Sequence, residues 1–321
     1  MANSPTVHDE TPGRRGARRR PILTNMPGRR LLAIVTGLIA VVFLSVVPVS
    51  AESPVTPAPA PALPRPFPFV SYLDLECFKT NPYQPPTTTL TLSHINPQLV
   101  SLPAHQVTLG NREQLCVPVI KDGWSPPPEV IDFIRYVDLS CYRVTGTPLN
   151  RRIVLSQLNP VFAGHPRFQT VIGAPEQLCV PVAKDHAFPP TPEIKELVSH
   201  IDLECYAVSP PDSLARPVVL HQLNPVLVNR IPRAQVQINR SPQLCLPVHK
   251  RGDVIPQRVL DIVQWIDLLK YDILAPAINP VPLTLSHLNP VLSHLPAEST
   301  VLLEAQQLAV PVAKNGVAPP G

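Results

Sequence analysis

Glycine and charged residues are scarce in this chain, which has 12 glycines and 16% charged residues among 321. Proline is abundant instead, at 45 residues. Proline breaks helix interiors, so this composition argues against long helices and favours extended segments and turns. Apolar residues make up 44% of the chain, enough for packed cores, so the chain is not disordered throughout.

Local motifs of common enzymes and metal sites are missing as well. The sequence has no Gly-x-Ser-x-Gly elbow, no P-loop and no Gly-x-Gly-x-x-Gly. It has no His-Glu-x-x-His, no Cys-x-x-Cys pair and no dense acidic cluster of the kind that calcium requires. We therefore predict no catalytic residue, no metal site and no cofactor.

Basic residues are in excess only near the N-terminus. Residues 1–51 hold seven arginines against Asp9 and Glu10. Subtracting these from the 27 basic and 23 acidic residues of the whole chain leaves 20 and 21. The remainder therefore lacks the basic surface that nucleic-acid binding needs, and no nucleic-acid partner is expected.

The N-terminal region has the features of an export signal. Arginines precede an apolar run over residues 31–47, and the small residues Val49 and Ala51 follow it. We predict a signal peptide over 1–51, cleaved after Ala51; the alternatives are an uncleaved membrane anchor and, less well matched, a twin-arginine signal at Arg29-Arg30. Each of these exports the remainder. The protein is expected to be secreted or held at the cell surface of a bacterium, touching membrane only through this segment.

Residues 52–68 are rich in proline and alanine, and this composition predicts an extended linker between the export signal and the folded part.

Cysteines occur in two recurring patterns, Asp-Leu-x-Cys and Leu-Cys-x-Pro-Val. A fourth copy keeps both surrounding patterns but has Lys270 and Ala309 in place of the two cysteines. Two independent thiols need not disappear together, whereas the two halves of one bond should. We therefore predict three disulfides, each within one copy: Cys77–Cys116, Cys141–Cys179 and Cys205–Cys245.

The repeat is regular in length. Its aspartates recur every 64 or 65 residues, and an Asn-Pro pair follows each of them by 21 or 22 residues. Such near-constant spacing indicates one supersecondary frame copied four times. The predicted repeats span residues 69–124, 125–188, 189–252 and 253–321. The aspartates are Asp74, Asp138, Asp202 and Asp267, and the asparagines are Asn96, Asn159, Asn224 and Asn289.

Within a repeat, β-branched and alternating stretches predict short strands, among them Thr87–Leu92, Ile153–Leu155, Pro217–Leu220 and Ala234–Ile238. The proline of Leu-Cys-x-Pro-Val suggests an edge strand or a bulge. We predict a mainly β protein, a tandem array of four small antiparallel β units with a short helix at each junction.

Helical periodicity appears at three junctions, at i, i+3, i+4 and i+7. Thr191 is a candidate N-cap. The first repeat has Pro66-Phe-Pro-Phe at this place, so its helix is expected to be missing. The apolar positions are Val130, Phe133, Ile134 and Val137; Ile194, Leu197, Val198 and Ile201; and Val259, Ile262, Val263 and Ile266.

The recurring polar residues favour structural over binding roles. We expect the four aspartates to cap a turn or the helix-to-strand junction, and the four asparagines to form turns before proline. Histidine occupies one repeated position in two copies, but glutamine replaces it in the others, which argues against a metal ligand there. These positions are His94, Gln157, Gln222 and His287.

Residues 70–315 resemble a repeat of secreted bacterial proteins of unknown function, in which Cys-Tyr is followed about 40 residues later by Leu-Cys-Val-Pro-x-x-Lys. The matching residues are Cys141-Tyr142 with Leu178–Lys184, and Cys205-Tyr206 with Leu244–Lys250. The family's central Asp-Gln-Phe is replaced by Ser156-Gln-Leu and His221-Gln-Leu, so a role of that aspartate is absent. The resemblance implies an exported repeat protein and no particular activity.

We therefore expect an exported, non-catalytic repeat protein with a structural or binding role. Its partner is expected to be an extracellular polymer, a glycan or a protein. The alternatives are an extracellular hydrolase with a site between repeats, whose sign would be a pocket with a titratable residue unique to one copy, and a secreted enzyme inhibitor.

Overall fold

The computed structural model describes residues 62–321, and the fold is mainly β, with short helices. The predicted signal peptide over 1–51 and residues 52–61 of the predicted linker lie outside the described residues. All strand pairs are antiparallel and belong to one sheet. The prediction of a mainly β, antiparallel fold is therefore confirmed.

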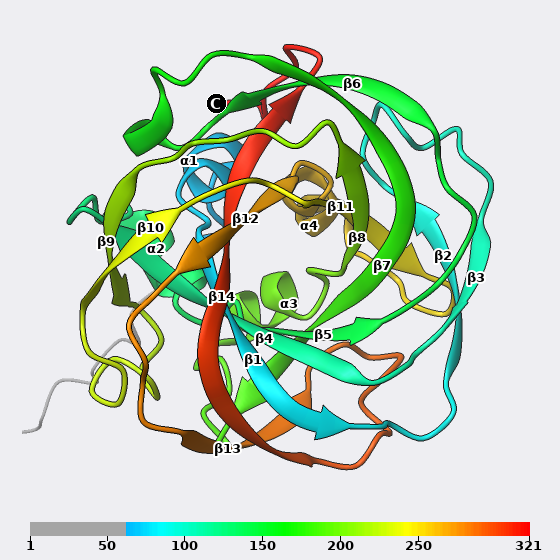
Figure 1. The fold of residues 1–321 in the computed structure, drawn as a ribbon. Helices are drawn as coiled ribbons and strands as arrows, with labels where there is room; N and C mark the ends of the chain where they lie inside the picture. Colours follow the sequence, from blue (N-terminus) through cyan, green and yellow to red (C-terminus); the bar gives the residue numbers. More distant parts are fainter. Residues whose placement is uncertain (1–61) are drawn as a thin grey trace, which may run out of the picture. The chain divides into compact units, whose positions relative to one another are not determined.

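Eight strands pair in a closed circle, each with the next and the last with the first. Figure 1 shows them arranged around a common centre. We call this circle the strand ring, and each predicted repeat supplies two of its strands. In order around the ring they are β1 (Leu75–Tyr83), β4 (Arg112–Lys121), β5 (Leu139–Arg143), β7 (Phe168–Lys184), β8 (Leu203–Ser209), β11 (Gln243–Lys250), β12 (Leu268–Leu274) and β14 (Glu298–Lys314).

Hairpins between the ring strands form an outer layer. Each hairpin pairs with a ring strand that lies two predicted repeats away: β2 with β11, β6 with β14, β9 with β4 and β13 with β7. In two of these hairpins the second strand is the first half of a long ring strand: β6 pairs with the first half of β7, and β13 pairs with the first half of β14. The remaining strands are β2 (Thr89–His94), β3 (His105–Thr108), β6 (Arg151–Gln157), β9 (Pro217–Gln222), β10 (Ala234–Ile238) and β13 (Val281–His287).

The strand pairing therefore crosses every predicted repeat boundary, and four separate β units are not seen. β1 of the first predicted repeat pairs with β14 of the fourth, through Leu75 and Ala309 among others. A physical reason is the small size of one repeat, which buries too little of its own surface to be stable alone. Pairing with neighbours on both sides gives each ring strand the partners that its own repeat cannot supply.

The proline of each Leu-Cys-x-Pro-Val segment lies where a ring strand changes partner, and not at a sheet edge. In β4, Cys116 pairs with β5, whereas Val119 pairs with β9. Pro118 lies between them, and its carbonyl accepts a hydrogen bond from the Leu223 amide at 2.9 Å. Because no ladder donor is needed at the change of partner, proline is tolerated there.

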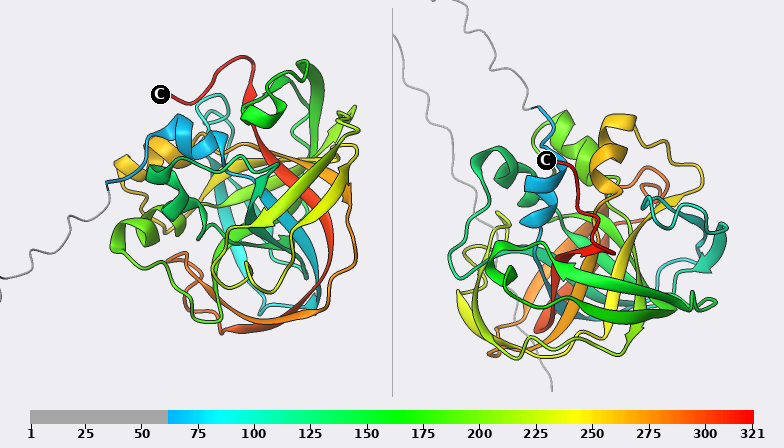
Figure 2. Two further views of the ribbon diagram at one scale, coloured as in Figure 1. Left: turned by 90° about the vertical axis from the view of Figure 1, so that its left-hand side faces the viewer. Right: turned by 90° about the horizontal axis from the view of Figure 1, so that it is seen from above.

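Four short helices gather at one end of the strands (Figure 2). The three predicted from periodicity are present, and the Thr191 hydroxyl caps its helix by accepting from the Ile194 amide. The expectation that the first repeat lacks a helix is wrong. Pro66 and Pro68 lie in its first turn, where a helix has no internal partner for the missing N–H. The helices are α1 (Pro66–Ser71), α2 (Pro128–Ile134), α3 (Pro192–Val198) and α4 (Gln257–Val263), and a 3-10 turn, η1, spans Pro160–Phe162.

The core has two main parts. One lies between the helices and the inside of the strand ring, and it includes the six cysteines together with residues such as Phe133 and Leu197. The other lies between the ring and the outer hairpins, and it includes Val236 and Ile238, which the alternation in β10 placed on one face. The Phe67 amide donates to the Pro320 carbonyl at 3.0 Å, so the start of the described chain lies beside its end.

Candidate functional site

The four repeated aspartates are buried in ion pairs. Each lies before the first ring strand of its repeat and pairs with the lysine that ends the second ring strand. All these side chains are at most 5% exposed. Burial raises the pKa of Asp267 to about 6, against the opposing effects of Lys314 and Asn96. The pairs are Asp74–Lys121, Asp138–Lys184, Asp202–Lys250 and Asp267–Lys314.

The asparagine of the Asn-Pro pair joins these ion pairs from another repeat. The Asn159 side-chain amide donates to Asp74 Oδ2 at 2.7 Å and to the Ser71 carbonyl at 3.3 Å, and its oxygen accepts from the Val161 amide at 2.9 Å. The asparagine thus forms the turn that its sequence predicts, and it also links two repeats. We call each Asp–Lys–Asn group a clamp. The other clamps use Asn224 with Asp138, Asn289 with Asp202, and Asn96 with Asp267.

The lysines of the clamps were missed as members of a site, although the sequence contains a signal for them. In every copy a lysine follows the second cysteine position by five residues, including Lys314 after Ala309 in the copy without cysteines. Its persistence there shows that the lysine does not depend on the disulfide. It accompanies the aspartate, whose charge it balances in the interior.

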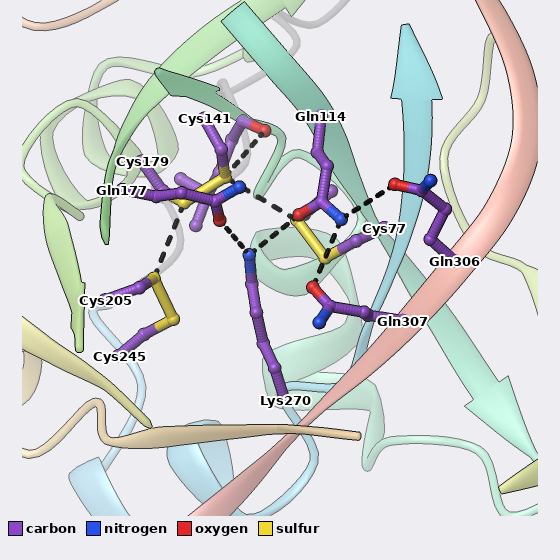
Figure 3. Close-up of a disulfide and its surroundings, with 12 residues drawn as sticks. Cys77, Gln114, Cys141, Gln177, Cys179, Cys205, Cys245, Lys270, Gln306 and Gln307 are labelled. Atoms are coloured by element: carbon purple, nitrogen blue, oxygen red, sulfur yellow. Dashed lines mark hydrogen bonds between the residues drawn. A yellow bond between two sulfur atoms is a disulfide. The ribbon is translucent and has the colours of Figure 1, made fainter. Parts of the chain in front are cut away.

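The three disulfides lie inside the strand ring. They join the same pairs that the sequence predicts: Cys77–Cys116, Cys141–Cys179 and Cys205–Cys245. The two cysteines of each bond face each other in the sheet register. Successive bonds are neighbours, with the sulfur atoms of Cys179 and Cys205 3.7 Å apart (Figure 3). Three disulfides suggest an oxidising environment.

Lys270 and Ala309 take the place of a fourth disulfide, in the same register. The small Ala309 side chain leaves room for the lysine, which is 1% exposed. Lys270 Nζ donates to Gln114 Oε1 at 2.9 Å and to Gln177 Oε1 at 2.7 Å (Figure 3). Burial lowers the pKa of Lys270 to about 7, although nearby glutamates act in the opposite direction.

The glutamines form a further layer, which lies toward the end of the ring away from the helices. One glutamine precedes each second cysteine position by two residues, a regularity that sequence reasoning did not use. A pocket of about 420 Å³ opens over two of them, with Lys79, Glu113 and Arg143 among its walls. The glutamines are Gln114, Gln177, Gln243 and Gln307.

Three tyrosines whose side chains lie outside the ring donate their hydroxyls to carboxylates that are at most 10% exposed. Each carboxylate also pairs with an arginine or a histidine. The groups are Tyr142–Glu298–Arg112, Tyr206–Glu204–His105 and Tyr271–Asp212–His165, with hydroxyl-to-carboxylate distances of 2.6, 2.5 and 2.6 Å. The first repeat differs, because Phe78 replaces the tyrosine, and Glu76 has Gln222 as its one side-chain donor among residues 62–321, at 2.6 Å. Burial raises the pKa of Glu76 to about 7, against the opposing effect of the hydrogen bond from Gln222.

Glu76 should make stability depend on pH. Its folded pKa of about 7 lies above the ordinary 4.5, so the folded state binds more protons between these values and stability falls as pH rises through them. We expect Glu76→Gln to be more stable than wild type by about 3 kcal/mol at pH 8 and equal to it at pH 4, in denaturant titrations. Glu204→Gln is the matched control at the same repeat position. It should destabilise at pH 8, because His105 and Tyr206 lose their carboxylate. Parallel pH curves for wild type and Glu76→Gln would contradict this account.

The Tyr206 group borders a pocket of about 560 Å³, larger than the other pockets described here. Leu102, Pro103, Pro148 and Leu149 form apolar walls, and His94, His105 and Tyr206 provide polar atoms. The His105 side chain is 30% exposed, and its hydrogen bond to Glu204 raises its pKa. Desolvation lowers the pKa of His94 to about 4, so this ring is neutral.

One repeated position supplies a side chain to each of these groups. The residues at this position are His94, Gln157, Gln222 and His287. His94 contacts the Tyr206 hydroxyl, Gln157 donates to the Tyr271 hydroxyl and His287 contacts Glu298. Residues 62–321 contain no group of three or more His, Cys, Asp or Glu side chains arranged to hold a metal ion.

None of the helices described is long and apolar enough to cross a membrane. Comparisons with protein-family models, with curated proteins and with solved structures found no match.

Proposed function

We propose that this protein is an exported binding protein of the cell surface or extracellular space. Its ligand is an N-acetylated sugar at the end of a cell-wall polymer or glycan, held in the pocket beside Tyr206 and His105. The observation that carries the proposal is this pocket, whose size suits one small ligand and whose apolar walls surround a few fixed polar groups.

The lining fits such a sugar. Leu102, Leu149 and the two prolines offer an apolar surface for the acetyl methyl group and the apolar face of a sugar ring. Gln106 and Thr147 offer hydrogen bonds for an amide and hydroxyls. His105 is fixed by Glu204, so its ring is preorganised as part of the wall.

Export and the repeated architecture belong to the same proposal. The apolar leader, the disulfides inside the ring and the resemblance to secreted repeat proteins support secretion or surface attachment. The fourfold recurrence of the clamps supports four copies of one motif, each contributing two ring strands and one outer hairpin. In this arrangement the copies share one frame, and residues of the first three copies line the pocket.

Two threonines of one loop allow a matched test. Thr147 lines the pocket and is exposed, whereas Thr145 is exposed on the same loop outside it. We expect N-acetylglucosamine tetramer to bind the full-length protein saturably, with chemical-shift changes at Gln106 and Thr147. Thr147→Trp should weaken the affinity at least about 10-fold by filling the pocket, and Thr145→Trp should leave it unchanged. Absence of saturable binding, or equal affinity of both variants, would overturn the proposal.

A further inference from the structure

His200 and Asp253 depart together from the repeated pattern. At the position two residues before the clamp aspartate, the other copies have Tyr72, Tyr136 and Trp265. At the position three residues after the clamp lysine, the other copies have Trp124, Ala187 and Val317. In the third copy these two positions hold a histidine and an aspartate. Because both positions differ from the other copies in the same repeat, we infer that His200 and Asp253 act together and have a role specific to the third copy.

The two side chains are in contact. His200 Nδ1 lies 2.9 Å from Asp253 Oδ2, and the aspartate side chain is 1% exposed. Asn289 also donates to Asp253 Oδ2, at 3.3 Å, so the carboxylate is held from the neighbouring repeat. A carboxylate at Nδ1 fixes the tautomer that carries its proton on that nitrogen, and this leaves the lone pair on Nε2.

The free nitrogen belongs to a residue that lines a pocket. His200 Nε2 has no hydrogen-bond partner among residues 62–321, and His200 borders a pocket of about 400 Å³. The pocket lies between the third and fourth predicted repeats, with Lys195 and Ser199 on one side and Leu288 and Ser293 on the other. An oriented imidazole lone pair can remove a proton from a hydroxyl or water, and a lysine that lines the same pocket can stabilise a developing negative charge.

We propose that His200 is a general base, oriented by Asp253, in a site between repeats that hydrolyses small esters. His200 Nε2 takes a proton from a water molecule while the water oxygen bonds to the ester carbonyl carbon. The Lys195 ammonium faces the negative charge that forms on the carbonyl oxygen. The carbon–oxygen bond to the alcohol then breaks, and the proton on Nε2 passes to the leaving oxygen, which gives a carboxylic acid and an alcohol. Asp253 is a positioning residue. This activity corresponds to the extracellular hydrolase with an inter-repeat site, and it would exist beside the proposed sugar binding, in a separate pocket.

The test uses p-nitrophenyl acetate as the probe and the full-length protein. We expect His200→Gln to lower kcat/KM by about 100-fold, and Asp253→Asn to lower kcat by about 10-fold or more with little change in KM. His294→Gln is the matched control, because His294 is an exposed histidine of the same region and is not in the site. The wild-type reaction should be slower in deuterium oxide, and this isotope effect should disappear in His200→Gln.

The outcomes separate a hydrolytic site from background reactivity. Equal rates for wild type and His200→Gln, or an equal loss in His294→Gln, would overturn the proposal, since surface imidazoles would then account for the turnover. Thermal unfolding of each variant shows whether it is folded. If Asp253→Asn does not fold, because Asn289 also depends on Asp253, the comparison of His200→Gln with His294→Gln and the isotope effect still decide the question.

Discussion

Lys184→Met should destabilise the protein by about 3–5 kcal/mol, because it leaves the Asp138 carboxylate buried without its cation. Both side chains are at most 4% exposed, so water cannot replace the lost partner. Asn224 remains, but one amide does not balance a full charge. Equilibrium denaturation of the single variant and of Lys184→Met/Asp138→Asn measures the effect. The double variant should lose less than the sum of the single losses, since it contains no unpaired charge.

A surface ion pair provides the control for this experiment. Lys79 and Glu304 lie 3.3 Å apart, but their side chains are 50% and 62% exposed. Lys79→Met should therefore change stability by less than about 1 kcal/mol. A loss in Lys184→Met no larger than that of Lys79→Met would show that the clamp does not hold an ion pair in the interior.

Lys270→Cys/Ala309→Cys should form a fourth disulfide in protein produced under oxidising conditions. The two positions face each other in the same register as the existing cysteine pairs. The loop closed would equal the 39-residue separation of Cys77 and Cys116, and such a closure stabilises by about 4 kcal/mol in the chain-entropy model. Gln114 and Gln177 lose their ammonium donor, which offsets part of this gain.

The gain should be larger at pH 6 than at pH 10. The folded pKa of Lys270, about 7, lies below the ordinary 10.5, so wild-type stability rises with pH between these values and is lower below pH 7. Replacing the lysine removes that penalty at pH 6. Non-reducing peptide mapping and unfolding at both pH values test the prediction, with Lys270→Ala as the variant that removes the ammonium without a cross-link. Free thiols at positions 270 and 309 in otherwise oxidised protein would refute it.

Sequence patterns predicted the elements of this fold better than their partners. The helices α2, α3 and α4 and the strand β10 follow from periodicity, because the pattern of buried positions is a local property of the chain. The disulfides followed from a joint loss of two residues. By contrast, Asn96 binds Asp267 across a sequence separation of 171 residues, and a repeating pattern says which residues are alike without saying which copy they contact.

Some residues of the sites recur in the sequence at fixed spacing, but their burial does not follow from that recurrence. The clamp lysines and the layer of glutamines recur in all four copies, yet polar residues are ordinarily assigned to the surface, so their recurrence was not read as burial. α1 was missed for a different reason. Pro66-Phe-Pro-Phe stands where the other repeats have the helical pattern, but both prolines lie in the first turn, where the missing donor has no partner. His200 and Asp253 are 53 residues apart, and only the structure brings them together.

Closure of the strand ring has a consequence for biogenesis. In a chain that emerges with its N-terminus first, β1 is present long before β14, and until β14 arrives one edge of β1 has no neighbour. Such an edge pairs readily with other chains. The ring can therefore close only after the C-terminal segment is available, when the last strand β14 pairs with the first strand β1.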